Sequence, residues 1–149
     1  MSGIVLRPAA PEDAEALARV AHDSFHQAFA AIMSPAALAQ RPLDFFAGRF
    51  AEQWPEVVVA LVGGRIVGFS MVRQGHIDML FVDPATQARG VGKALLAAAE
   101  GGGARTLECF RDNGEARAFY EKHGWQLTSS LRRNFCGEDY DFVTYARPR

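Results

Sequence analysis

Two β-rich runs that flank a pair of glycines constrain the fold of this chain most strongly. Residues 57–62 and 65–72 are dominated by Val, Ile and other apolar side chains, and only Gly63 and Gly64 separate them. Glycine adopts the positive φ angles of a two-residue hairpin turn without strain, so this pattern predicts a β-hairpin. The chain therefore contains a sheet with at least one antiparallel pair of strands.

Strands and helices alternate along the rest of the chain. Residues 76–82 form the next expected strand, and their apolar C-terminal half is typical of a central strand covered on both faces. Because helical crossovers join parallel strands and a hairpin joins antiparallel ones, the expected class is α/β (α+β), a mixed sheet with helices on both faces. Three other strands are expected at residues 4–7, 105–110 and 140–146, and a further strand is expected to begin at residue 124. One helix is expected to begin at residue 11, and two others are expected at residues 90–100 and 115–123.

Length and charge limit the function classes. A chain of 149 residues that is 49% hydrophobic can form one sizeable core, so a single domain over residues 1–149 is expected. The 16 Lys and Arg residues against 17 Asp and Glu give a net charge of -1. This balance provides no field that would attract nucleic acid or an anionic membrane surface. An anionic ligand would therefore have to be bound locally.

The absence of targeting signals, together with the cysteine content, predicts a cytoplasmic protein. No apolar run approaches the ~20 residues of a membrane-spanning helix, and the N-terminus lacks the basic start and apolar core of a signal peptide. Cys109 and Cys136 are expected to be reduced, structural thiols. His22 and His26 lie one helical turn apart, but no further ligand stands at metal-binding spacing, so no metal is expected.

The glycine-containing segment 87–94, between the central strand and the next helix, could bind phosphate in three ways. A P-loop would need glycine and a hydroxyl where Gln87 and Ala94 stand, and a dinucleotide fingerprint would need a small residue at Leu95. A pyrophosphate cradle of the form Gln/Arg-x-x-Gly-x-Gly/Ala fits, because Gly90 and Gly92 allow close approach and the first helical turn offers unpaired N–H groups. The alternative is that these glycines only let the helix pack tightly on its strand.

Two motifs resemble those of one enzyme superfamily. Residues 81–84 (Phe-Val-Asp-Pro) followed by residues 87–96 resemble the acetyl-CoA signature of the GNAT N-acetyltransferase superfamily. Residues 113–125 are similar to that superfamily's next motif, Asn-x-x-Ala-x-x-Phe-Tyr-x-x-x-Gly-Phe, with tryptophan in the last position. The stretch 76–84 most resembles small bacterial members.

The resemblance implies a fold and a co-substrate. The fold is a mixed, mostly antiparallel seven-stranded sheet that is splayed between its fourth and fifth strands. The co-substrate is acetyl-CoA, whose pantetheine arm would bind the backbone of the central strand and whose pyrophosphate would bind the loop and helix N-terminus. Asn113 would contact the pantetheine or cap its own helix. The cofactor-binding residues implied are Leu80, Phe81, Val82, Gln87, Ala88, Arg89, Gly90, Val91, Gly92, Lys93 and Asn113.

Transfer of an acetyl group from a thioester to an amine requires a base and an acid. By resemblance, Tyr120 is the phenol that protonates the departing CoA sulfur. His76 stands fourteen residues before Gly90, where several family members carry a glutamate base, and a neutral imidazole can also deprotonate an amine. If no bulge breaks the strand alternation, Asp78 lies on the same side as His76 and can orient its ring.

With these residues, the resemblance implies an enzyme that moves the acetyl group directly to a primary amine of a small molecule or peptide. The alternative is a non-catalytic acyl-CoA binding or sensing domain, and a homodimer is left open. An acyl intermediate on Cys109 is not expected, because the sequence shows no activating base beside it. Aromatic and arginine residues either line the acceptor pocket or fill the core and coat the surface: Phe25, His26, Phe29, Trp54, Arg132, Arg133, Phe135 and Tyr140.

Overall fold

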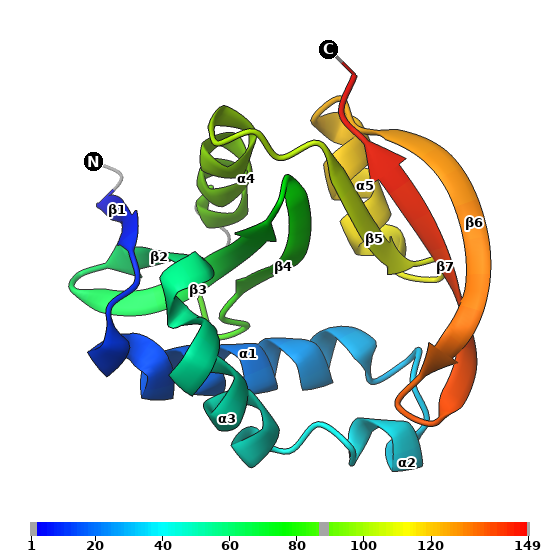
Figure 1. Cartoon of the computed structure of the whole chain (residues 1–149), viewed down its shortest axis with the longest axis horizontal. Coiled ribbons are helices and arrows are strands. Elements are labelled where there is room, and N and C mark those ends of the chain that lie inside the picture. Colours follow the sequence, from blue (N-terminus) through cyan, green and yellow to red (C-terminus); the bar gives the residue numbers. More distant parts are fainter. Residues whose placement is uncertain (1–2, 87–89, 149) are drawn as a thin grey trace.

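The computed structural model describes residues 3–86 and 90–148, and these form a single seven-stranded sheet with helices packed on it (Figure 1). The strand order is β1-β2-β3-β4-β5-β7-β6. In chain order the elements are β1 (Ile4–Pro8), α1 (Ala14–Phe29), α2 (Pro35–Leu38), α3 (Leu43–Gln53), β2 (Val57–Val62), β3 (Arg65–Arg73), β4 (His76–Val82), α4 (Val91–Gly101), β5 (Thr106–Phe110), α5 (Gly114–Lys122), β6 (Gln126–Phe135) and β7 (Glu138–Ala146).

Pairing within the sheet is antiparallel except between β4 and β5, which run parallel. The predicted hairpin is formed by β2 and β3, with Gly63 and Gly64 at φ 60° and 78° in its turn. The parallel pair arises because α4 carries the chain over the sheet between the two strands. The predicted mixed, mostly antiparallel architecture is thus confirmed.

The sheet is splayed between β4 and β5. These strands pair only at His76 with Thr106 and at Ile77 with Leu107, whereas β4 pairs with β3 along its length. Beyond Ile77, the β5-facing edge of β4 therefore has no strand partner among the described residues. Unpaired backbone N–H and C=O groups need a hydrogen-bonding partner, so this edge is a place where a polar ligand can take the position of a strand.

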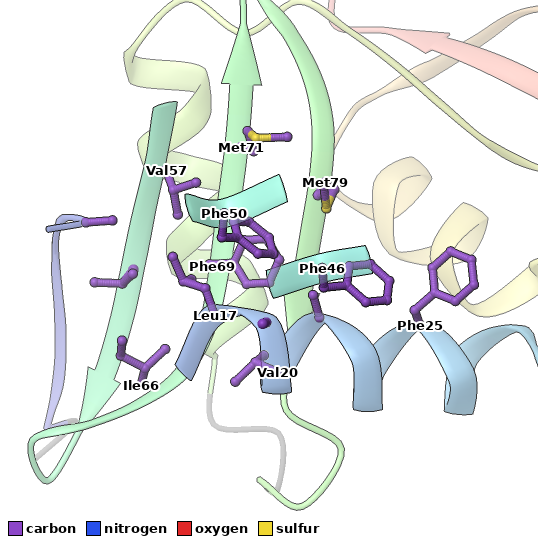
Figure 2. Packing of buried hydrophobic residues seen from close by; sticks show 14 of the residues in the cluster. Leu17, Val20, Phe25, Phe46, Phe50, Val57, Ile66, Phe69, Met71 and Met79 are labelled. Atoms are coloured by element: carbon purple, nitrogen blue, oxygen red, sulfur yellow. The ribbon is translucent and has the colours of Figure 1, made fainter. Parts of the chain in front are cut away.

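Helices cover both faces of the sheet, as the sequence predicts. Phe46 and Phe50 of α3 and Leu17 of α1 pack over Phe69 and Met71 of β3 (Figure 2). On the opposite face, α4 packs its apolar side on β2 and β3. None of the helices in the two described ranges combines the length and apolar character needed to cross a membrane.

Gly68 of β3 lies where β4 and α4 approach most closely. A Cβ atom there would stand 2.9 Å from the carbonyl oxygen of Phe81 and 3.2 Å from Val91 Cγ1. The first of these neighbours is backbone, which cannot rotate away as a side chain can. Gly68 is therefore required by the packing that places β4 beside α4.

We expect Gly68→Ala to lower the free energy of unfolding by about 1–3 kcal/mol, the usual range for overpacking. Gly48→Ala is the matched control, because Gly48 is exposed in the middle of α3 and a Cβ there would meet nothing within 4 Å. The control should raise the free energy of unfolding by about 0.5–1 kcal/mol, since alanine is the better helix former. Urea denaturation measures both, and equal shifts in the two variants would contradict the packing argument.

Candidate active site

A cavity of about 290 Å³ lies in the splay between β4 and β5. Its lining comes from both strands, from α5, from α1 and α3, and from the far ends of β6 and β7. Six residues predicted from the sequence line this single cavity: His76, Asp78, Leu80, Phe81, Asn113 and Tyr120. The fold thus gathers in one place residues from two motifs that are separate in the chain.

Tyr120 occupies the last part of α5 and is buried, with only 8% of its surface exposed. Its ring packs near Trp125, and Cys109 of β5 packs against the same buried cluster. Burial, and secondarily the neighbouring Cys109, raise the pKa of Tyr120 well above the ordinary phenol value. The phenol therefore carries its proton throughout the physiological pH range.

His76 begins β4 at the closed end of the splay. Its Nδ1 lies 2.8 Å from the hydroxyl oxygen of Thr106, the residue directly opposite it in the parallel pair. Because this hydrogen bond occupies Nδ1, Nε2 is the ring nitrogen left for chemistry. Strand pairing and a side-chain hydrogen bond together fix the position of the imidazole.

The expected strand alternation between His76 and Asp78 is interrupted. In the pairing of β4 with β3, Met79 stands opposite Met71 and Ile77 opposite Val72, so Asp78 is an extra residue in a β-bulge. The unbroken alternation that would place Asp78 beside His76 is therefore absent. The Asp78 carboxylate instead lies 3.5 Å from Arg73 and 3.9 Å from Arg49.

Part of the main chain is exposed at the bulge. Asp78 is an exposed residue although only 24% of its side-chain surface is exposed, so its main chain contributes much of the exposure. A bulged residue is left out of the regular ladder, and its polar backbone groups are free to meet a ligand. At the far end of the strand, the Val82 carbonyl already accepts a hydrogen bond of 3.0 Å from the Ser24 hydroxyl of α1.

The N-terminus of α4 begins at a glycine in the left-handed conformation. Gly90 is the N-cap at φ 82°, and among the described residues no side chain caps the helix and no atom lies within 4 Å of a Cβ placed on Gly90. The first intrahelical bond there is donated by the Ala94 N–H to the Gly90 carbonyl, so the N–H groups of residues 91–93 have no helical acceptor. Together with the exposed side chain of Lys93, this helix start fits an anionic group such as a pyrophosphate.

The two glycines of the loop differ in role. Gly90 supplies a left-handed backbone conformation and an open approach, as a ligand cradle requires. A Cβ on Gly92 would lie 3.6 Å from the ring of Phe119, at ordinary packing distance, so the packing of α4 does not by itself require glycine at this position. Just before the loop, the Thr86 hydroxyl is buried without a hydrogen-bond partner in the described part of the chain. The predicted residues Gln87, Ala88 and Arg89 lie outside the described residues.

The sequence profile of the acetyltransferase (GNAT) domain matches residues 9–146. The chain belongs to the GNAT acetyltransferase family. The family predicted from the two motifs is thereby confirmed, and the splayed sheet and helix N-terminus described above are parts of this GNAT domain.

Relatives and solved structures agree with this assignment. The chain is 31% identical over 86 residues to the peptidyl-lysine N-acetyltransferase YjaB of Salmonella typhimurium, a match that covers 55% of this chain and 57% of that protein. The chain thus spans about half the length of the curated relatives it matches. The solution structure of apo YjaB from Escherichia coli superimposes with a TM-score of 0.79 at 26% identity and covers 96% of both chains. A GCN5-related N-acetyltransferase structure from Rhodopseudomonas palustris gives a TM-score of 0.77 at 32% identity, covering 99% of this chain and 96% of that one.

In this GNAT domain Asn113 caps its own helix. Its side-chain oxygen accepts a hydrogen bond of 3.1 Å from the Ala116 N–H at the start of α5, while its position also lines the cavity. We expect Asn113→Ala to lower the free energy of unfolding by about 1 kcal/mol. Asn113→Asp preserves the cap, so its loss of stability should be less than half of that in Asn113→Ala. Thermal denaturation measures both variants. Equal losses in both variants would contradict the capping role.

Several residues of the GNAT cavity could not be recognised in the sequence. Of the aromatic and arginine residues whose role was open, Phe25, Phe29, Arg133 and Phe135 line the cavity, whereas His26, Trp54, Arg132 and Tyr140 are not among its lining. The structure adds Arg41, Arg49 and Glu108 to the wall. No local pattern distinguishes these three residues from solvated surface charges.

Proposed function

We propose that this protein transfers the acetyl group of acetyl-CoA directly to a primary amine of a small molecule or peptide, with both substrates bound at once. The observation that carries the proposal is that Tyr120, His76 and the free edge of β4 line one cavity. Membership of the GNAT family supports the reaction class. The name of the YjaB relatives makes a lysine side chain one candidate acceptor.

The two ends of acetyl-CoA would bind different parts of the splay. The N–H groups at the start of α4 and the charge of Lys93 would bind the pyrophosphate, and the free edge of β4 would pair with the pantetheine amides. Acetyl-CoA supplies an activated acyl group as a thioester. The main chain of β4 lines the cavity beyond Ile77, where β4 has lost its pairing with β5, and one of its N–H groups is the candidate donor for the oxyanion that forms when the thioester is attacked.

His76 would act as the base. When Nδ1 donates its proton to Thr106, Nε2 carries a lone pair and can take a proton from the incoming ammonium group, directly or through a water molecule. The neutral amine then attacks the thioester carbonyl carbon, a C–N bond forms, and the C–S bond breaks. The proton taken from the ammonium group remains with the imidazole or passes to solvent. The nitrogen loses its second proton as the amide forms, and this proton replaces the one that Tyr120 gives to the departing sulfur.

Tyr120 would act at the leaving sulfur. A phenol whose pKa is raised by burial presents an O–H group at every pH at which the thiolate forms. Donating this hydrogen to the sulfur stabilises the negative charge that builds up as the C–S bond breaks. Because both groups line one cavity, base and acid can act on the same acyl centre.

Amine-dependent release of CoA thiol tests the proposal. The assay monitors free thiol in the presence of acetyl-CoA and a panel of amines, amino acids, polyamines and lysine peptides. Binding of acetyl-CoA without thiol release for any of these amines would support the alternative of a non-catalytic acyl-CoA binding domain. Thermal stabilisation alone does not separate the two functions, because both predict about 2.7 kcal/mol at 100 times the dissociation constant.

Direct transfer predicts that no acetyl group accumulates on Cys109. Burial raises the pKa of this thiol to about 11, so at pH 7 only about one molecule in ten thousand carries the thiolate nucleophile. Intact-mass measurement after incubation with acetyl-CoA alone should show unmodified protein. Alkylation of Cys109 by iodoacetamide should become about tenfold faster for each pH unit between 7 and 9, as deprotonation increases. An acetyl adduct mapped to Cys109 would overturn direct transfer.

A further inference from the structure

The lining of the cavity carries an excess of positive charge. Three guanidinium groups line it, those of Arg41, Arg49 and Arg133, against the two carboxylates of Asp78 and Glu108. An alkylammonium acceptor is itself a cation before it loses its proton. In a partly enclosed cavity, this excess charge opposes entry of an amine that carries no compensating negative group.

Ion pairs account for two of these three arginines. Arg133 of β6 pairs with Glu108 of β5, since its Nε and one terminal nitrogen both donate to Glu108 Oε1. Arg49 lies 3.9 Å from Asp78, which also pairs with Arg73. Desolvation lowers the pKa of Arg49, and its Nε donates to Gln53 at 2.8 Å. These two groups are therefore already committed to partners within the fold.

Arg41 differs from the other two because no carboxylate within the described ranges lies at ion-pair distance from it. One of its N–H groups donates to the Gln40 carbonyl at 3.2 Å. A guanidinium group has five N–H donors, so most of its donors remain for a ligand. Arg41 lines the cavity and has no carboxylate to balance its charge, whereas Arg49 and Arg133 each have one. Together these observations indicate that an anion can bind at Arg41.

The fold holds Arg41 rigidly. Its guanidinium carbon lies 4.1 Å from the ring centroid of Phe45 and 5.2 Å from that of Phe135. Its backbone carbonyl accepts a hydrogen bond of 2.7 Å from His26 Nε2. Contact with aromatic rings engages the faces of a guanidinium group and leaves its N–H edge available, which is the edge that binds a carboxylate.

From these contacts we infer that the acceptor is a primary amine that carries its own carboxylate on an apolar body, and that Arg41 binds this carboxylate. The inference rests on the proposed acetyltransferase function and specifies its acceptor. Such a molecule enters as a zwitterion with no net charge, and its carboxylate balances the uncompensated guanidinium. The rings of Phe25, Phe29 and Phe46 supply the apolar surroundings for its carbon skeleton. An apolar α-amino acid has this chemistry, whereas a lysine side chain in a peptide does not.

Phenylalanine and phenethylamine form a matched pair of acceptors, because they differ by the carboxylate alone. We expect kcat/KM for thiol release to be at least tenfold higher with phenylalanine, a difference expected for one charge-assisted hydrogen-bonded pair. In Arg41→Met this preference should fall to within about threefold, and Arg41→Lys should retain part of it. Arg65→Gln is the control, because Arg65 is exposed at the β2–β3 turn and does not line the cavity. The affinity for acetyl-CoA should be unchanged in Arg41→Met.

The outcomes separate this inference from the proposed function. Equal kcat/KM for the two amines, or faster thiol release with an N-terminally blocked lysine peptide than with phenylalanine, would overturn the inference and leave the acetyltransferase intact. If no amine releases thiol, the proposed function fails, and calorimetry with N-acetylphenylalanine and N-acetylphenethylamine still tests the anion site. If N-acetylphenylalanine binds at least tenfold more tightly than N-acetylphenethylamine, and this difference is lost in Arg41→Met, the anion site is supported. Equal binding of the two compounds would contradict it.

Discussion

Tyr120→Phe is expected to lower kcat for amine-dependent thiol release by about 100-fold or more, the usual effect of removing a positioned general acid. The substitution deletes one oxygen atom from a buried ring and leaves the packing against Trp125 in place. No residue within 3–86 and 90–148 hydrogen-bonds the Tyr120 hydroxyl, so its removal leaves no buried partner unsatisfied. The loss should therefore appear in kcat and not in the stability of the fold.

Tyr145→Phe provides the matched control. Tyr145 is also buried, but its hydroxyl is bonded to Arg117 and Glu121, and it does not line the cavity. This variant should lose about 1–3 kcal/mol of stability because hydrogen bonds to charged groups are removed, and it should keep kcat within about threefold of the wild-type value. The opposite pattern, with activity lost in Tyr145→Phe and kept in Tyr120→Phe, would remove the acid role from Tyr120.

The pH profile offers a second check on the acid. Burial raises the pKa of Tyr120, so deprotonation of this phenol begins at a higher pH than for an exposed tyrosine. If its protonated form is the active one, wild-type activity should not fall through loss of this proton as the pH rises from 7 to about 10. An alkaline decline below pH 9 that disappears in Tyr120→Phe would show that the phenol titrates earlier than its burial implies.

Where short-range sequence signals define a helix or strand, its ends were predicted to within about two residues. The β2–β3 hairpin follows from the two glycines of its turn, and α4 follows from the apolar run that begins after Gly90. The splay was implied only by the resemblance, because nothing in β4 or β5 alone shows that their pairing ends after Ile77. That break depends on how each strand bends against the helices that cover it.

The surroundings of the site could not be predicted for a related reason. The bulge at Asp78 is a property of the pairing between β3 and β4, and an alternating strand pattern contains no sign of it. Arg41 stands in an irregular segment before α3, and only the approach of β6 places the ring of Phe135 against it. Cavity walls built from segments far apart in the chain leave no periodic signal in any one of them.

His76→Asn is expected to lower kcat/KM for amine-dependent thiol release by about 100-fold. Asparagine keeps a side-chain N–H that can donate to Thr106, but it has no basic nitrogen.

Thr106→Val separates the chemistry of His76 from its orientation. The variant removes the 2.8 Å hydrogen bond that occupies Nδ1 while leaving a basic ring in place. If the threonine serves to select the ring form with a free Nε2, kcat/KM should fall by about tenfold, which is less than in His76→Asn because a basic ring remains. Activity of His76→Asn within about threefold of wild type would instead assign the proton transfer to water molecules in the cavity. In that case the hydrogen bond between His76 and Thr106 would serve only to close the end of the splay where β4 and β5 meet.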